Sequence, residues 1–236
     1  MEQDADDSLA RRVHQILDRI RCAAERAGRS PETVRLVAAT KTVPAEWVRE
    51  GLHAGLSLLG ENRMQEALSK IALLRDLSPR WHFIGQLQRR KVRDAIGTFE
   101  LIHSVDSVEL AQEISRRAGD AGVKQAVLLE VNIAGEASKA GFQPDVLMRD
   151  LAILGGMPHL RVQGLMTIPP PTIEPEEARP YFRELRILGA RIASEKIPSL
   201  VMQELSMGMS QDFEVAIEEG ATLVRVGTAI FGARHV

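Results

Sequence analysis

The residues of this chain that could do covalent chemistry begin with a lysine at the end of an apolar run. Lys41 follows the apolar residues 36–39 and one threonine, so its stem would leave a buried strand and its amine would emerge at the strand's end. Desolvation among other hydrogen-bond donors favours the neutral amine, which condenses with aldehydes. Lys41 is therefore a candidate for a covalent bond to a carbonyl compound. Without supporting features, a salt-bridging lysine explains the position equally well.

Two loops of small residues near the C-terminus could bind an anion. They read Ser-Met-Gly-Met-Ser over residues 206–210 and Gly-Thr-Ala-Ile-Phe-Gly over residues 227–232. Hydroxyls and free backbone amides in such turns bind phosphate groups. Glycines at ordinary turns would give the same composition, so these loops taken alone are a weak signal.

Arg225 precedes the second of these loops and limits the chemistry of any ring bound there. Its guanidinium group stays charged and can only donate hydrogen bonds. A pyridine nitrogen that faces it must accept, and so remains unprotonated. Such a ring is a poorer electron sink than one paired with a carboxylate. Arg225 thus argues against demanding carbanion chemistry.

The elements that would position these residues alternate along the chain between short apolar runs and longer amphipathic segments. The apolar runs predict eight strands, at residues 35–40, 56–59, 81–84, 101–103, 126–131, 162–166, 200–205 and 223–226. The clearest helical patterns between them cover residues 46–54, 62–74, 107–121, 175–193 and 212–220. Strict alternation of strand and helix predicts parallel strands joined by right-handed crossovers.

Eight such units in 236 residues favour a closed (β/α)8 barrel of the TIM type, with an open doubly wound sheet as the alternative. A further amphipathic helix is predicted from Leu9 until Gly28 ends it. Only ten residues follow Val226, too few for a full covering helix, so we expect the N-terminal helix to close that gap. We expect residues 1–236 to form a single domain in which residues 1–7 are disordered.

Polar residues follow nearly every predicted strand. In a barrel the loops after the strands form one shared mouth, where chemistry is carried out. Any one of these residues is most simply explained by contact of a strand end with water, but their joint occurrence favours a binding site. They are Lys41, Glu61, Asn62, His82, Ser104, Asn132, Thr167, Ser206, Arg225, Gly227 and Thr228.

The composition narrows the class of partner and compartment. Thirty basic and thirty-two acidic side chains nearly cancel, so no overall field attracts nucleic acid or a membrane surface. The basic cluster of residues 89–93 reads as a solvated helix face, since no aromatic platform accompanies it. Cys22 is the only cysteine, no zinc spacing occurs, and neither a secretory signal nor a membrane span is visible. We expect a cytoplasmic protein without a bound metal.

At the level of motifs, the chain resembles the pyridoxal phosphate homeostasis proteins of the YggS/PROSC type over about residues 10 to 235. The ordered agreement of many short segments makes coincidence a poor explanation. The matching segments are residues 36–42, 60–62, 81–85, 103–106, 131–133, 138–141, 164–166, 205–210 and 224–232.

The resemblance implies a fold like the N-terminal barrel of alanine racemase, with pyridoxal 5'-phosphate held as a Schiff base on Lys41. The two small-residue loops would hold the phosphate and Arg225 would face the pyridine nitrogen. The role implied is to buffer and deliver the cofactor, in vitamin B6 homeostasis and amino-acid balance, without substantial catalysis. The implied cofactor-binding residues are Lys41, Asn62, His82, Ser206, Met207, Ser210, Arg225, Gly227 and Thr228.

Two other functions would use parts of the same site. An amino-acid racemase needs a second acid/base opposite Lys41. Racemases of this type take that group from a further C-terminal domain of the partner subunit. Because the chain ends at Val236, we expect the group to be missing. A lysine-dependent sugar-phosphate aldolase would need no cofactor. The expected partners are apo-enzymes that use pyridoxal phosphate, and the expected state is a monomer. Lys139 is a candidate secondary acceptor of the aldehyde, with an ordinary surface lysine as the simpler reading.

Overall fold

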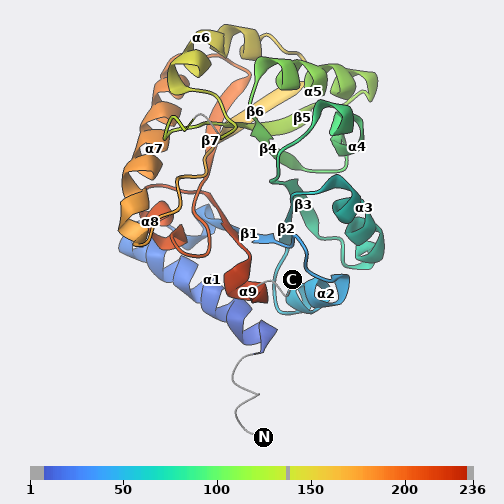
Figure 1. Ribbon diagram of the computed structural model, residues 1–236, viewed down its shortest axis with the longest axis vertical. Helices are drawn as coiled ribbons and strands as arrows, with labels where there is room; N and C mark the ends of the chain where they lie inside the picture. The colour runs from blue at the N-terminus through green and yellow to red at the C-terminus, as the bar shows by residue number, and fades with distance from the viewer. Residues whose placement is uncertain (1–7, 137–138, 233–236) are drawn as a thin grey trace, which may run out of the picture.

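Eight parallel strands close into a barrel in this computed structural model, which describes residues 8–136 and 139–232. Each strand pairs with the next along the chain, and β8 returns to pair with β1 through Leu36 opposite Val224. Figure 1 shows the helices arranged around the outside of this ring. The strands are β1 Arg35–Ala39, β2 Leu58–Glu61, β3 Arg80–Phe83, β4 Leu101–Val105, β5 Gln125–Glu130, β6 Leu160–Met166, β7 Leu200–Ser206 and β8 Leu223–Val226.

All eight predicted strands are confirmed, with ends that differ by no more than two residues. The closed barrel is confirmed and the open sheet is not. The helices of the described residues are α1 Leu9–Arg26, α2 Ala45–His53, α3 Met64–Leu73, α4 Val92–Ala95, α5 Val108–Asp120, α6 Pro144–Gly155, α7 Arg179–Ser194, α8 Phe213–Glu218 and α9 Thr228–Phe231. None of them is long and apolar enough to cross a membrane. The expectation of disorder for residues 1–7 lies outside the described residues.

Side chains of the strands alternate between two packed layers. Along β8, Leu223 belongs to the cluster inside the barrel, whereas Val224 and Val226 pack in the layer between strands and helices. Because successive strand side chains point to opposite faces, Arg225 points to the inside with Leu223. The interior cluster comprises Val37, Leu58, Leu101, Ala126, Leu128, Met166 and Leu223, with Ile84 packed against it.

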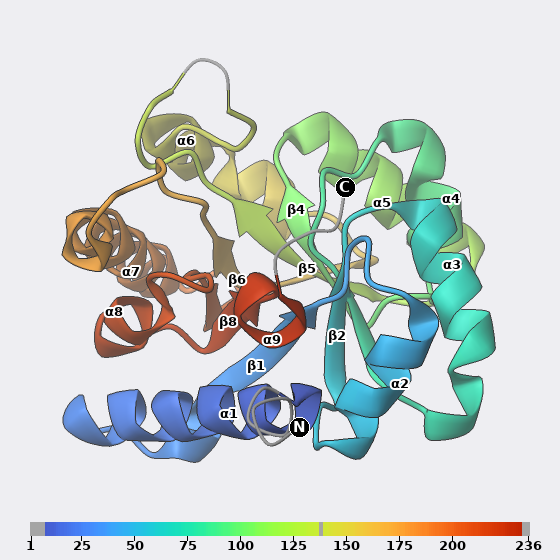
Figure 2. The ribbon, with the colours of Figure 1, turned by 60° about the horizontal axis from the view of Figure 1, so that its bottom comes forward.

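Helix α1 closes the gap beside the last strand, as predicted. Ser8 caps it by accepting a hydrogen bond from the Arg11 amide at 3.3 Å, and its apolar stripe is buried. Figure 2 shows α1 lying along α8, α9 and α2 beneath β1. Arg12 fastens it to α9 by donating to the Ile230 carbonyl at 2.7 Å. Within the described residues, the segment after β8 adds the single turn of α9.

Candidate functional site

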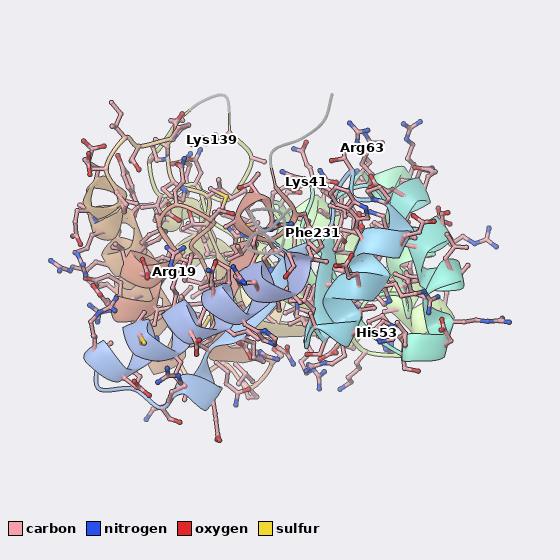
Figure 3. All side chains as sticks on the ribbon, turned by 90° about the horizontal axis from the view of Figure 1, so that it is seen from below. Arg19, Lys41, His53, Arg63, Lys139 and Phe231 are labelled. Carbon is pink, nitrogen blue, oxygen red and sulfur yellow. The ribbon has the colours of Figure 1, made fainter. Side chains whose placement is uncertain are left out.

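The segments that follow the strands lie at one end of the barrel. In Figure 3 the labelled side chains Lys41, Arg63 and Lys139 lie at the upper end of the molecule, and His53 lies at the lower end. The upper end is where the strands finish, since Lys41 follows β1 and Lys139 follows β5. The shared mouth expected from the sequence is thus formed at this end.

Lys41 and the turn after β8 line the same hollow. The space measures about 210 Å³, far more than the roughly 30 Å³ that one water molecule takes up in the liquid. One wall comes from the segment after β1 and the other from the start of α9. Its lining residues are Ala39, Lys41, Thr42, Val43, Pro44, Trp47, Gly227, Thr228, Phe231 and Gly232.

The turn at Gly227 is shaped to bring backbone close to β1. A side chain there would place its Cβ 3.0 Å from the Ala39 carbonyl oxygen, so any other residue would require the turn or β1 to give way by a few tenths of an ångström. The Ser210 hydroxyl accepts from the amides of Gly227 and Ala229 at 3.3 and 3.4 Å, and its own proton is used by neither bond. Ser210 therefore joins the two small-residue loops into one cradle of hydroxyl and amide groups.

Arg225 lies inside the barrel, where it is 5% exposed. One terminal nitrogen donates to the Ser206 hydroxyl at 2.6 Å and the other to the Thr167 carbonyl at 2.9 Å. Burial lowers the pKa of Arg225 to about 10, while Glu130 and Asp212 oppose the shift. The guanidinium group consequently stays charged at neutral pH, with further N–H donors not used in these two bonds.

Two buried histidines extend this arrangement. His103 contacts Ser206 through Nδ1 at 2.9 Å and His82 through Nε2, again at 2.9 Å. Burial lowers the pKa of His82 to about 3, and it lowers the pKa of His103 well below its ordinary value, with the positive charge of Arg225 adding to the effect. Both imidazoles are therefore neutral at physiological pH.

Several buried polar atoms at the strand ends have no hydrogen-bond partner among the described residues. They include Asn62 Oδ1 after β2, Ser104 Oγ in β4 and His82 Nε2 in β3. Buried polar groups are ordinarily paired because an unmade hydrogen bond costs about 1–3 kcal/mol. Such unpaired atoms fit a polar ligand that would satisfy them.

A buried ion pair holds the backbone on both sides of Lys41. Lys70 of α3 donates to the Thr40 carbonyl, to Glu61 at 2.7 Å and to Glu66 at 2.7 Å. Thr40 donates its hydroxyl proton to Glu61 at 2.6 Å. Glu66 also accepts from the Thr42 amide at 2.5 Å, which supports the left-handed backbone of that residue, with φ of 62°. The turn that presents Lys41 is thus fixed from behind.

Glu130 at the end of β5 is a second group that the sequence did not single out. Burial raises its pKa to about 7; the nearby charge of Asp106 adds to the shift and that of Arg225 opposes it. It also lines a separate hollow of about 180 Å³ with Asn132 and Lys139. Lys139 is paired there with Glu136 at 2.7 Å.

The structure places most of the predicted cofactor residues in two groups, and Met207 belongs to neither. Lys41, Gly227 and Thr228 line one hollow, and Ser210 braces its wall. Ser206, Arg225 and His82 belong to the buried interior.

Met207 packs in the layer between strands and helices, where it is fully buried, and its amide donates to the Leu223 carbonyl at 3.1 Å. This placement leaves Met207 neither a free amide nor an exposed side chain for a ligand. The hydroxyl of Ser206 is likewise bonded to Arg225 and His103 instead of lying open in the phosphate loop.

Comparison with known proteins gives one consistent result. Residues 12–235 match the family model described as the alanine racemase N-terminal domain. The pyridoxal phosphate homeostasis protein of Aquifex aeolicus is 49% identical over 223 residues, which cover 94% of this chain and 97% of that protein. The structure of PipY from Synechococcus elongatus with PLP bound is 38% identical, with a TM-score of 0.83 over 95% of this chain and all of PipY. The structure of alanine racemase from Clostridium difficile is 17% identical, with a TM-score of 0.68 over 95% of this chain and 56% of the racemase. At this identity the likeness shows the fold alone.

Proposed function

Because this chain belongs to the alanine racemase N-terminal domain family and to the pyridoxal phosphate homeostasis proteins, we propose that it binds pyridoxal 5'-phosphate, buffers its supply and hands it on, with Lys41 as the covalent acceptor. One observation carries the assignment of the lysine. Lys41 lines the same hollow as Gly227 and Thr228, so an amine and an anion cradle face one small space. That is the pair of features that an aldehyde bearing a phosphate requires.

The residues around the hollow fit the parts of this cofactor. The Lys41 amine would bond to the aldehyde carbon, and the turn at Gly227 with the Ser210 hydroxyl would hold the phosphate. Asn62 Oδ1, after β2, is buried without a partner among the described residues and would supply an acceptor. Arg225 would donate to the ring nitrogen from inside the barrel. When bound, the cofactor supplies a reactive aldehyde and an electron-withdrawing ring.

The charge arrangement favours holding the cofactor over transforming a substrate. Arg225 keeps its proton at neutral pH, so the ring nitrogen opposite it accepts a hydrogen bond and gains no charge. His82 and His103 behind it are neutral. A ring in these surroundings would withdraw electrons weakly, which suits a protein that carries the cofactor and does not use it for catalysis.

We further propose that the carrier works as a monomer in the cytoplasm and passes its cofactor to apo-enzymes. The single cysteine of the sequence suits a reducing compartment. Trp47, Ile168 and Met209 are exposed after β1, β6 and β7. These apolar groups around the mouth offer a receiving enzyme a surface beside the cofactor.

A spectroscopic titration tests the proposal. Addition of pyridoxal phosphate to the protein should produce the absorbance of a lysine-bound cofactor, and Lys41→Ala should abolish it. Lys124→Ala is the matched control, because Lys124 is exposed before β5 at the opposite end of the strands. An unchanged spectrum with Lys41→Ala would contradict the assignment of the lysine.

A further inference from the structure

Four buried side chains inside the barrel form one continuous line of hydrogen bonds. Arg225 contacts Ser206 at 2.6 Å, Ser206 contacts His103 at 2.9 Å and His103 contacts His82 at 2.9 Å. Their exposed fractions are 5% for Arg225 and 1% or less for the other three. Such a line is held far from competing water.

The direction of every proton in this line follows from the chemistry of its ends. Arg225 can only donate, so the Ser206 oxygen accepts from it. Of the two side chains that contact the Ser206 hydroxyl among the described residues, only His103 can take its proton, and a buried hydroxyl left without an acceptor is costly. Nδ1 of His103 is therefore the acceptor, and the neutral ring carries its proton on Nε2.

The same reasoning reaches the last member. Nε2–H of His103 donates to Nδ1 of His82 at 2.9 Å, so the neutral His82 carries its proton on Nε2 as well. Both rings are kept neutral by burial, and a second positive charge beside Arg225 would be disfavoured. The Nε2 proton of His82 then has no partner among the described residues. The opposite order would leave two buried atoms unpaired, the Ser206 proton and Nε2 of His82. Each of the two histidines is thus held in a single protonation state.

We propose that His82 and His103 are positioning residues for Arg225, which act by holding the Ser206 hydroxyl with a lone pair toward the guanidinium group. A serine hydroxyl can rotate, and its proton turned toward Arg225 would repel that group. His103 prevents the rotation by accepting the proton, and His82 fixes the tautomer of His103. Together with the Thr167 carbonyl at 2.9 Å, this locks both terminal nitrogens of Arg225.

This inference rests on the proposed function, in which the remaining Arg225 donors face the ring nitrogen of the cofactor. It changes the role of Ser206, whose hydroxyl accepts a hydrogen bond from Arg225 and donates one to His103. Ser206 then serves the ring end of the site. The phosphate end is left to Ser210 and the turn at Gly227.

Nuclear magnetic resonance on the cofactor-free protein tests the line of protons by itself. In a nitrogen-15 labelled sample, long-range proton–nitrogen correlations identify which ring nitrogen of each histidine is protonated. His82 and His103 should both remain neutral with the proton on Nε2 between about pH 5 and pH 8, with exposed His14 on α1 as a reference. A proton on Nδ1 of His103, or a doubly protonated ring in that range, would overturn the proposal.

Binding measurements then test whether the effect passes through Arg225. His103→Leu removes the acceptor for Ser206, whereas His103→Asn keeps an acceptor where Nδ1 stood. His103→Leu should weaken pyridoxal phosphate binding by about tenfold, the worth of one hydrogen bond to a charged group, and His103→Asn should restore most of it.

The control ligand is a deaza analogue of the cofactor in which C–H replaces the ring nitrogen. His103→Leu should leave its affinity nearly unchanged, because Arg225 has nothing to donate to there. Equal losses for both ligands would reveal a merely structural role and overturn the proposal. If the unaltered protein failed to bind pyridoxal phosphate, the proposed function would be wrong. The resonance experiment would still test the proposed positions of the protons on His82 and His103.

Discussion

Replacement of Lys70 by methionine strips the charge from the ion pair behind the cofactor lysine. The Lys70 side chain is 6% exposed and that of its partner Glu61 is fully buried. Lys70 donates to the Thr40 carbonyl and to two carboxylates. Lys70→Met keeps the length of the side chain but leaves the Glu61 carboxylate buried without its cation.

The expected cost follows from that burial. Removing one member of a buried ion pair costs about 3–5 kcal/mol, a large part of the roughly 5–15 kcal/mol that holds a typical protein folded. Burial already raises the pKa of Glu61, against hydrogen bonds from Lys70 and Thr40, and loss of Lys70 raises it further. A raised carboxyl pKa contributes stability that is complete below the ordinary value near 4.3 and is lost as the pH rises through the folded value. The cost of Lys70→Met should therefore be small near pH 4.5 and largest near pH 8.

Urea unfolding of the two proteins at both pH values measures this cost as a difference in the free energy of unfolding. Glu61→Gln added to Lys70→Met removes the stranded charge and should recover part of the stability at pH 8. Lys124→Met, at an exposed lysine, is the control and should cost less than about 0.5 kcal/mol. A loss below about 1 kcal/mol for Lys70→Met at pH 8, or one that does not depend on pH, would refute the reasoning.

Three further outcomes follow from single contacts. Gly227→Ala places a Cβ 3.0 Å from the Ala39 carbonyl oxygen, which should move the turn and weaken phosphate binding at least tenfold. A titration with inorganic phosphate or the cofactor measures this, and unchanged affinity would show that the turn is not part of the site. Gly208→Ala meets Ala216 Cβ at 2.5 Å with a φ of 90° and should lower the free energy of unfolding by about 1–3 kcal/mol, whereas a thermal midpoint equal to that of the unaltered protein would contradict this packing. Burial raises the pKa of Glu130 to about 7, so its contribution to stability is complete below about pH 4.3 and is lost as the pH rises through 7. Glu130→Gln should flatten that decline in the free energy of unfolding measured with urea, and parallel pH profiles for the two proteins would contradict this role of Glu130.

The fold could be read from the sequence because its signals are local. Each strand is marked by a short apolar run within its own segment, so it can be predicted without knowing which other segments it pairs with. Helix α6 is not among the clear predictions. Leu147, Leu151 and Leu154 form one buried stripe at helical spacing, but Val146 and the half-exposed Ile153 lie outside it and blur the pattern in the sequence.

The parts of the site that escaped prediction are those made by contacts between strands and helices. Glu66 and Lys70 have the spacing of an ordinary surface pair on a helix, and only the packing of α3 on β2 brings the buried Glu61 to them. His103 meets His82 across β3 and β4 and meets Ser206 from β7, a set that no spacing along the chain reveals. The sequence places Ser206 at the start of the small-residue loop 206–210, whereas strand alternation turns its hydroxyl inward, to Arg225 and His103.

Borohydride reduction followed by peptide mapping tests the central claim most directly. Reduction of the protein with bound pyridoxal phosphate makes the lysine–cofactor bond permanent, and mass spectrometry then locates the modified residue. The account predicts that the modified peptide contains Lys41 and that one cofactor is retained per chain. Modification at another lysine, with Lys41 recovered intact, would contradict it.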